Sequence, residues 1–472
     1  MIKFPGPITV SVLLTGLLTF SEFAAATPSA DTGVLAQQLE QEFKGAYSER
    51  LDPVGKVRSF ELTAAPAEWG VVPPYRTAVW AYNGTVPGPV LRIKLGETLK
   101  VKLTNNLAQS TTMHWHGIRV PNAMDGVPGV TQPPIKPGGS FTYQFTPKDA
   151  GTFWFHPHLN SPEQIERGLH GALIVEDSKE PRYSQDLVWV MDDWLFENGA
   201  SIYGQFVTGH DLAHDGRWGN VVTVNGKYLP SIPVKAGERL RIRLINAANG
   251  RVFSPAFDGL SPKVIAVDGM PAGAPFPLSQ FNLAPGNRLD LDLVIPKEAA
   301  GKLLVVSNRF GRSQQTLAFL DVATKTVVKT PTFEPPKAAH FPAWTEALAA
   351  PVAHEFILNA ERGGPYGISW TIDGKIGHEN VAATLPYGKF SRLRYTNKSG
   401  RLHPMHLHGQ FFKLLAVDGE PAQENFWRDT LLVGPKQSVD VGLVPLDKGL
   451  WANHCHILEH AEAGMMSTFK VE

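Results

Sequence analysis

The sequence predicts an all-β fold made of three β-sandwich domains, and two observations lead to it. The first is composition: 472 residues with 44 Gly and 38 Pro suit a turn-rich, strand-dominated protein, and the length alone suggests about three domains. The second is a repeat, because one unit recurs at residues 80–108, 221–249 and 370–400. Each copy has an Asn-Gly or Asp-Gly turn, an apolar strand, a Gly-centred turn and an alternating strand. We therefore expect half-buried antiparallel strands with hairpin turns, in three domains of sandwich size.

The N-terminal residues 1–26 are predicted to be a secretory signal peptide. Lys3 precedes the apolar run Ile8–Phe20, and Ala24–Ala26 offers small residues for cleavage. The run is too short to span a bilayer comfortably, and a retained anchor is the alternative. No other long apolar run follows, so we expect a periplasmic or secreted protein without a membrane span after signal removal. A short helix is expected around Val34–Phe43.

The three domains are expected at residues 27–178, 179–335 and 336–472. The first limit follows an apolar strand that ends near residue 178, and the second falls in the Pro-rich stretch Lys329–Lys337. Lys and Arg together number 44, as do Asp and Glu, so the formal net charge is zero. This balance gives no indication of nucleic acid or a polyanionic membrane surface as a partner.

The later half of the repeated unit separates the three copies chemically. Residues 403–419 align with residues 253–269 and both end in Ala-Val-Asp-Gly, but only the later copy contains histidines. Cys455 and its two flanking histidines align with His-Pro-His at residues 156–158 and with Val-Ser-Asn at residues 306–308. We therefore expect metal chemistry in the first and third copies, with the second copy as a spacer.

Ten of the 16 histidines fall into four short motifs of the first and third copies. Residues two apart on a strand project from the same face, so each His-x-His pair aims two imidazoles at one point. If the first and third copies pack together, eight imidazoles converge on a shared cleft. The four pairs are His114 with His116, His156 with His158, His406 with His408, and His454 with His456.

Cys455, the only cysteine of the chain, faces away from its two histidine neighbours by the same alternation. His403 lies three residues before His406, which also favours the opposite face. Cys455, His403 and His460 can therefore form a second site, with Met465 as a weak axial ligand. This is the ligand set of a blue-copper centre, whereas structural zinc sites are usually richer in cysteine. Chance surface histidines are the other alternative, and four aligned pairs argue against it.

At these motifs the chain resembles multicopper oxidases of the laccase type over nearly its whole mature length. The resemblance implies cupredoxin-like Greek-key sandwiches and four copper ions, one of type 1, one of type 2 and two of type 3. The type 1 ion would be held by His403, Cys455, His460 and Met465. The type 2 ion would be held by His114 and His406. The type 3 pair would be held by His116, His156, His158, His408, His454 and His456.

The resemblance also implies an enzyme with O2 and a small reducing substrate as partners. Electrons would enter at the blue copper and reach the cluster through Cys455 and its histidine neighbours, where O2 becomes water. Asp125 matches the family position of a proton donor, and its alternative is a plain turn residue of an Asp-Gly pair. Many bacterial relatives carry an acid directly after the second blue-copper histidine. This chain has Ala461 there, so Glu462 is a candidate for a second proton route.

The reductant is expected to be a phenol or an aromatic amine. The chain has only 8 Met and no methionine cluster that would capture Cu(I). An accessible edge of His403 or His460 would then be the point of electron entry. The alternatives are a metallo-oxidase acting on Cu(I), Mn(II) or Fe(II) in copper tolerance, and a non-enzymatic copper-binding protein. The six histidines outside the motifs, including His210 and His214, are interpreted as ordinary surface or core residues.

Overall fold

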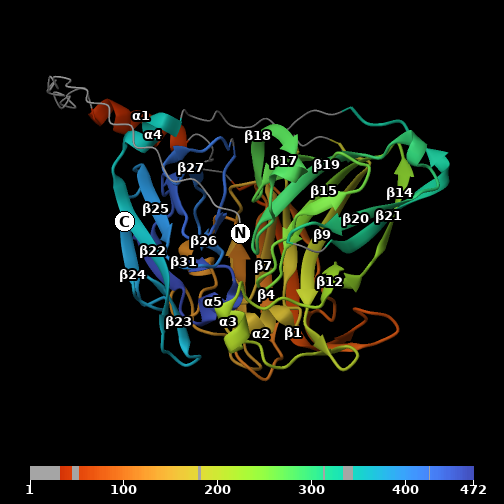
Figure 1. The fold of residues 1–472 in the computed structure, drawn as a ribbon, viewed down its shortest axis with the longest axis horizontal. Helices are drawn as coiled ribbons and strands as arrows, with labels where there is room; N and C mark the ends of the chain where they lie inside the picture. The colour runs from red at the N-terminus through yellow and green to blue at the C-terminus, as the bar shows by residue number, and fades with distance from the viewer. Residues whose placement is uncertain (1–31, 45–52, 179–181, 312–313, 333–343, 425) are drawn as a thin grey trace, which may run out of the picture.

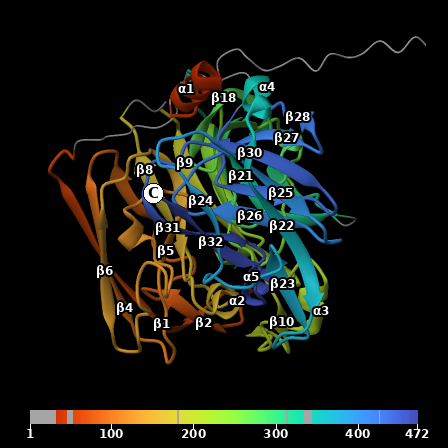
Figure 2. The same cartoon turned by 90° about the vertical axis from the view of Figure 1, so that its left-hand side faces the viewer.

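The computed structural model describes residues 32–44, 53–178, 182–311, 314–332, 344–424 and 426–472. Strands dominate these ranges and form three pairs of sheets, one after another along the chain, so the all-β prediction is confirmed. Figure 1 shows the C-terminal pair in blue on the left and the middle pair in green on the right. Figure 2 shows the N-terminal pair, in orange, beside the C-terminal pair. The predicted signal peptide lies outside the described residues.

The N-terminal pair of sheets shows the alternation that the sequence predicts. Leu99, Val101 and Leu103 are all buried, while Lys100 and Lys102 between them are exposed. One sheet has the order β2 (Thr77–Tyr82), β1 (Val57–Trp69), β4 (Thr98–Asn105), β6 (Ser140–Phe145). The other has the order β3 (Leu91–Lys94), β8 (Gly171–Glu176), β7 (Gly151–His156), β5 (His114–His116).

The middle and C-terminal pairs are larger and follow the same plan. The middle pair consists of β13 (Lys227–Tyr228), β12 (Val221–Val224), β9 (Gln185–Trp194), β15 (Arg239–Asn246), β19 (Arg288–Val294), β17 (Lys263–Val267) and β18 (Met270–Pro277), and of β14 (Ser231–Ala236), β21 (Gln315–Val327), β20 (Leu303–Asn308) and β16 (Pro255–Phe257). The C-terminal pair consists of β23 (Ile368–Ile372), β22 (Val352–Arg362), β25 (Ser391–Asn397), β30 (Ser438–Leu443), β27 (Lys413–Val417) and β28 (Glu420–Pro421), and of β24 (Val381–Leu385), β32 (Met466–Val471), β31 (Gly449–Cys455), β26 (His403–Leu407) and β29 (Thr430–Val433). Two short strands, β10 (Phe196–Glu197) and β11 (Ser201–Ile202), form a separate ribbon.

Some neighbouring strands run parallel, which corrects the expectation of hairpins throughout. In the N-terminal pair, β1 pairs with β4 and β3 pairs with β8 in parallel, and the other two pairs repeat this arrangement. The reason is that the turn at Gly96 (φ 89°) carries the chain from β3 in one sheet to β4 in the other. The Asn83-Gly84 turn is tight as predicted, with both residues at positive φ (54° and 75°).

Short helices cover the two ends of the molecule. At one end, α1 (Thr32–Lys44), close to the range predicted from sequence, buries Leu39 and Phe43. At the other end lie α2 (Ser161–Glu166), α3 (Gly209–Ala213) and α5 (Leu458–Glu462), and α5 contacts the other two although each helix comes from a different domain. A further helix, α4 (Trp344–Ala349), contacts α1. Among the described helices, none is both long and apolar enough to cross a membrane.

Candidate metal centres

Antiparallel pairing places the histidine motifs opposite one another within each outer pair of sheets. In β5 and β7, His114 lies opposite His156. In β26 and β31, His406 lies opposite His454, and Met405 lies opposite Cys455. Each sheet therefore supplies two neighbouring histidine-bearing strands, as the His-x-His spacing requires.

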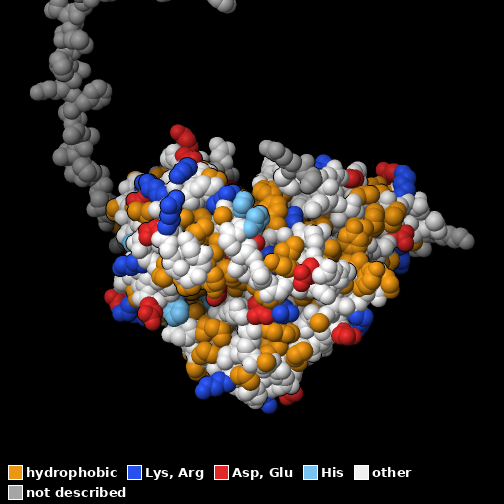
Figure 3. Space-filling model, turned by 60° about the horizontal axis from the view of Figure 1, so that its bottom comes forward, with side chains coloured by type: hydrophobic (Ala, Val, Ile, Leu, Met, Phe, Trp, Pro, Cys, Tyr) orange, Lys and Arg blue, Asp and Glu red, His pale blue; other side chains and the backbone are white. Residues whose placement is uncertain are grey.

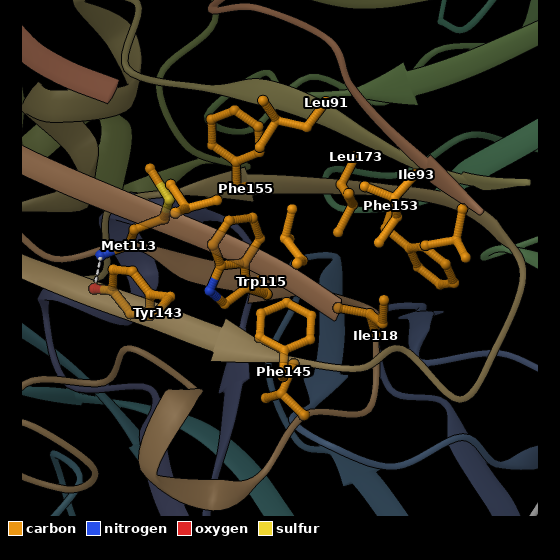
Figure 4. Close-up of a cluster of buried hydrophobic side chains, with 14 of the residues drawn as sticks. Leu91, Ile93, Met113, Trp115, Ile118, Tyr143, Phe145, Phe153, Phe155 and Leu173 are labelled. Atoms are coloured by element: carbon orange, nitrogen blue, oxygen red, sulfur yellow. Dashed lines mark hydrogen bonds between the residues drawn. The ribbon is translucent and has the colours of Figure 1, made fainter. Parts of the chain in front are cut away.

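Residues between the histidines anchor these strands in the cores. Trp115, between His114 and His116, is fully buried and packs against Phe145 and Phe155, with ring centroids at 5.3 and 5.6 Å. Figure 4 shows this cluster, in which Trp115 lies among aromatic and aliphatic side chains of the N-terminal domain. Because Trp115 occupies the core face, the neighbouring histidines project from the other face of β5.

The eight imidazoles meet between the N-terminal and C-terminal domains, and all are buried. The rings of His114 and His408 stack with centroids 3.8 Å apart, and so do those of His116 and His406. The Nε2 atom of His454 lies 3.0 Å from Nε2 of His408 and 3.2 Å from Nε2 of His158. The His156 and His456 rings, with centroids 5.4 Å apart, complete the group. We call these eight residues the histidine cluster.

Burial favours the neutral, metal-binding form of seven of the eight imidazoles. Desolvation, reinforced by neighbouring imidazoles, holds the pKa of His116, His158 and His408 well below the usual range. Burial also lowers the pKa of His454 to about 3. Neutral imidazole nitrogens are ready ligands for copper, zinc or iron, so this environment needs no proton release before an ion binds.

Outer hydrogen bonds fix which nitrogen of each ring faces the centre of the cluster. Nδ1 of His114 and of His406 bonds to the main-chain carbonyl of Asp125 and of Asp429, at 2.8 and 2.9 Å. His116 is turned the other way: its Nε2 meets Thr430 Oγ1 at 3.2 Å, and its Nδ1 faces His156. Such outer bonds set the tautomer and the ring orientation of metal-binding histidines.

Several inward nitrogens are left without a hydrogen bond, which is the signature expected of a metal site. Nε2 of His114, Nε2 of His406 and both nitrogens of His456 are buried and have no hydrogen-bond partner in the ranges that the structure describes. A buried polar atom left unpaired costs about 1–3 kcal/mol. Copper ions held by these nitrogens would remove that cost, so the donor set fits the metal that the sequence predicted.

The second centre lies on the opposite face of β31. Cys455 Sγ is 3.6 Å from Nδ1 of His403 and 4.0 Å from Nδ1 of His460, and these two nitrogens are 3.3 Å apart. Met465 is fully buried in the same core, and its main chain bonds to both Cys455 and His460. Burial raises the pKa of the Cys455 thiol, and the charge of a bound metal ion would offset this and favour the thiolate. We call His403, Cys455, His460 and Met465 the thiolate site.

The prediction of an accessible histidine edge at this site is wrong. His403 and His460 are both 0% exposed. The outer nitrogen of His403 lies 2.9 Å from Ser399 Oγ, and that of His460 lies 2.9 Å from the main-chain carbonyl of His214. The cause is tertiary: a segment of the middle domain covers α5, which no local pattern in the sequence could indicate.

The two candidate proton donors lie in different environments. Asp125 is buried, and its Oδ2 lies 2.8 Å from Nδ1 of His408 while its Oδ1 lies 3.3 Å from Nδ1 of His114. Glu462 is exposed at the end of α5, outside the buried cluster. Sequence reasoning missed Glu459, a buried acid that accepts hydrogen bonds from Arg217 N and Asn249 Nδ2. Burial raises the pKa of Glu459 to about 7.

The middle domain is more than the spacer that the sequence suggested. Arg288 donates to both carboxylate oxygens of Asp429, at 2.8 and 2.6 Å, and Asp268 accepts from the main-chain nitrogens of Asp429 and Thr430. Asp429 Oδ1 in turn lies 3.3 Å from His116 Nε2. We call Asp268, Arg288 and Asp429 the charge clamp. These charged residues lie at the ends of apolar strands, a position that did not indicate their partners.

Three pairs of cupredoxin-like sheets with a thiolate site and a histidine cluster define a copper protein of the oxidase class. Three sequence profiles, each described as multicopper oxidase, match residues 67–180, 185–330 and 350–472. The chain is 30% identical over 449 residues to the multicopper oxidase MmcO of Mycobacterium tuberculosis, covering 87% of this chain and 86% of that protein. It therefore belongs to the multicopper oxidase family.

Two further comparisons agree with this assignment. The chain is 25% identical to Laccase-1 of Cryptococcus neoformans, over 95% of this chain and 84% of that protein. The crystal structure of a multicopper oxidase from Pseudomonas thermotolerans superposes with a TM-score of 0.79 at 32% identity, over 88% of this chain and 99% of that one. The protein is thus a copper-dependent oxidoreductase that uses O2 and a reducing substrate, with four copper ions in type 1, 2 and 3 sites.

Proposed function

We propose that the chain is a laccase-like oxidase that takes single electrons from phenols and aromatic amines and reduces O2 to water. One observation carries the proposal. Cys455 belongs to the thiolate site, while its neighbours His454 and His456 belong to the histidine cluster. An electron delivered to the thiolate site therefore has a route of a few covalent bonds to the cluster.

The ligand assignment follows the geometry. We assign the type 1 ion to His403, Cys455, His460 and Met465. We assign the type 2 ion to His114 and His406, whose inward nitrogens have no hydrogen-bond partner in the described ranges. We assign one type 3 ion to His158, His408 and His454, whose nitrogens lie together, and the other to His116, His156 and His456.

The residues around the cluster have separable tasks. Bound copper supplies the electrons that O2 needs in quick succession, so that partly reduced oxygen is not released. Asp125 joins two ligands through His408 and His114, and its carboxylate is placed to deliver protons to the cluster. The outer hydrogen bonds hold each ring in place, and complete burial limits the access of bulk water.

Location and domain limits belong to the same proposal. We propose that residues 1–26 are removed as a signal peptide and that the enzyme acts in the periplasm or outside the cell. We place the domain limits near residues 178 and 335. These limits are supported by the sheets, because the strands of each sheet come from only one of the three ranges.

A metallo-oxidase acting on Cu(I), Mn(II) or Fe(II) is the second candidate. The burial of both thiolate-site imidazoles favours it, since a bulky phenol cannot touch either ring directly. The experiment is a donor panel on copper-loaded protein, comparing a phenol with Cu(I) under O2, with and without added copper. Phenol turnover that appears only with excess copper would favour the metallo-oxidase.

Cys455→Ser tests the electron route itself. The loaded wild-type protein is expected to be intensely blue, because Cys455 donates charge to the type 1 ion. The variant should lose both the colour and O2 consumption, while electron paramagnetic resonance should still detect the type 2 ion in the cluster. His354→Gln, which changes a histidine outside the four motifs whose ring bonds to Asp373, is the matched control and should remain blue and active. Turnover that survives in Cys455→Ser would refute the route.

A further inference from the structure

A segment of the middle domain closes the thiolate site from outside. We call residues Thr208–Trp218, which contain α3, the cover segment. Its N-terminal end is fixed by a capping box in which Thr208 and Asp211 each bond to the other's main chain. Leu212 is fully buried in the core of the C-terminal domain, although it belongs to the middle one. The segment is therefore packed into the neighbouring domain.

Four hydrogen bonds join the cover segment to the C-terminal domain. Trp370 Nε1 donates to the carbonyl of Leu212 at 3.1 Å, and Leu402 N donates to Asp215 Oδ1 at 3.0 Å. The main-chain nitrogen of Arg217, which belongs to the cover segment, donates to Glu459 Oε2 of α5 at 3.0 Å. The fourth bond links the His460 ring to the carbonyl of His214 at 2.9 Å. These bonds fix the cover segment to β23, to the start of β26 and to α5. The segment therefore has a defined position over the thiolate site.

The outer surface of the segment is open to solvent. The His210 side chain is 76% exposed, and its ring stacks on the exposed His214 ring at a centroid distance of 4.2 Å. The face of the molecule that carries α3 comes forward in Figure 3, where histidine side chains reach the surface among hydrophobic and uncharged ones. In front of His460, the protein surface that a reductant meets is the cover segment.

We propose that the cover segment is the electron-entry gate, and that the His214 carbonyl is the last group that an electron crosses before His460. The inference rests on the proposed function, because it requires the type 1 ion at the thiolate site. The reductant loses one electron, a phenol releases its proton to solvent, and the electron passes along the His214 main chain and the His214–His460 hydrogen bond. A type 1 ion held at the thiolate site would accept this electron and pass from Cu(II) to Cu(I). The segment thereby sets how closely a bulky donor approaches.

A single substitution at Gly216 should displace the cover segment from α5. Gly216 has a φ of 80°, and an added Cβ would lie 2.5 Å from Cγ2 of Ile457 and 2.8 Å from Oε2 of Glu459. Such contacts cannot be accommodated without a shift, so Gly216→Ala should move the segment away from α5. Gly209→Ala is the matched control in the same segment, because its added Cβ would meet nothing within 4 Å.

The first test uses the copper-free protein and no turnover. Diethyl pyrocarbonate modifies accessible imidazoles, and mass spectrometry reports which histidines react. In wild type and in Gly209→Ala, His210 should react fast and His460 should stay protected. In Gly216→Ala, His460 should become reactive while His403, held behind Ser399, stays protected. Reaction of His460 in wild type at the rate of His210 would overturn the proposed gate.

The second test uses the copper-loaded protein with a bulky phenol and with ferrocyanide as a small donor. Gly216→Ala should raise kcat/KM for the bulky phenol by roughly tenfold and change that for ferrocyanide much less, as expected of a lid. Leu212→Ala, which removes the buried anchor, should act in the same direction. The proposal would be overturned if His460 became reactive in a variant but the ratio of kcat/KM for the bulky phenol to kcat/KM for ferrocyanide stayed at the wild-type value. Wild-type protein that is neither blue nor active with either donor would instead refute the proposed function.

Discussion

The thiolate site and the histidine cluster are built in two different ways. The thiolate site takes all four proposed ligands from the C-terminal domain, from β26, β31, α5 and the turn before β32. The histidine cluster takes four ligands from each outer domain, and the charge clamp, which joins the middle domain to Asp429 of the C-terminal domain, contacts it through His116. One centre therefore needs a single folded domain for its ligands, whereas the other forms only where the two outer domains meet, with the middle domain supporting it.

Lowering the pH should have the largest effect, and it should act on the stability of the copper-free protein through the histidine cluster. Burial lowers the pKa of nine motif histidines. Below about pH 6.5 these histidines bind protons in the unfolded protein but resist protonation in the folded protein. The unfolded state then binds more protons, and stability falls as pH falls below that value. At pH 5 each histidine whose pKa lies well below that pH costs roughly 2 kcal/mol. Together they exceed the roughly 5–15 kcal/mol that stabilises a typical domain.

The copper-free protein is accordingly expected to unfold by about pH 5 and to be stable above pH 7. Urea titrations between these values measure the stability, and their pH dependence gives the number of protons taken up on unfolding. Because seven of the nine histidines belong to the cluster, the interface between the outer domains should open first. Uptake of only one or two protons would contradict the deep burial of the cluster.

Asp125→Asn should have the next largest effect, and only on the cluster. The variant keeps the shape of the side chain but cannot transfer a proton as a carboxyl group does, and general acid catalysis by one positioned group contributes about 10²–10⁴-fold. O2 consumption should fall by roughly 10²-fold or more, while stopped-flow bleaching of the blue colour by a phenol without O2 should be unchanged. Glu462→Gln is the control, and its exposed position predicts little change in either step. Equal losses in both variants would contradict the distinction between the two acids.

Arg288→Lys should have the smallest effect and tests the role of the middle domain. Lysine keeps the charge but cannot donate to both oxygens of Asp429, so the orientations of His116 and of the proposed type 2 ligand His406, whose Nδ1 lies 3.4 Å from Asp429 Oδ1, are loosened. Outer partners of metal ligands are typically worth about 10–100-fold in metal affinity. Copper titration should show weaker binding in the cluster and an altered type 2 resonance signal, with the blue colour retained.

Arg251→Lys is the matched control for the charge clamp. Arg251 is a buried arginine of the same domain that pairs with Asp193, away from the cluster. Its substitution should leave copper affinity and the type 2 signal unchanged. If the Arg288 and Arg251 variants both kept the wild-type signal while remaining folded, the charge clamp would be a structural link between domains and no more.

Local periodicity predicted much of the fold and of the donor sets. Alternation along β31 was enough to separate Cys455 from His454 and His456, because side-chain direction on a strand depends on the backbone alone. Periodicity could not predict the parallel strand pairs. In sequence the turn at Gly96 looks like a hairpin turn, but the strands on its two sides lie in different sheets. The contacts of the charge clamp and the cover segment were missed because Asp268, Arg288 and the cover segment belong to the domain without ligands, and only tertiary packing brings them to the sites.

The same packing restricts how this enzyme can be shortened. A version with residues 179–335 excised would retain every proposed copper ligand and look complete on paper. It would also expose the buried Asp429 carboxylate without Arg288, and leave the ring of His460 facing solvent where His214 now covers it. When homologous chains are shortened or recombined, the middle domain should therefore be exchanged together with the residues that it contacts at the charge clamp and under the cover segment.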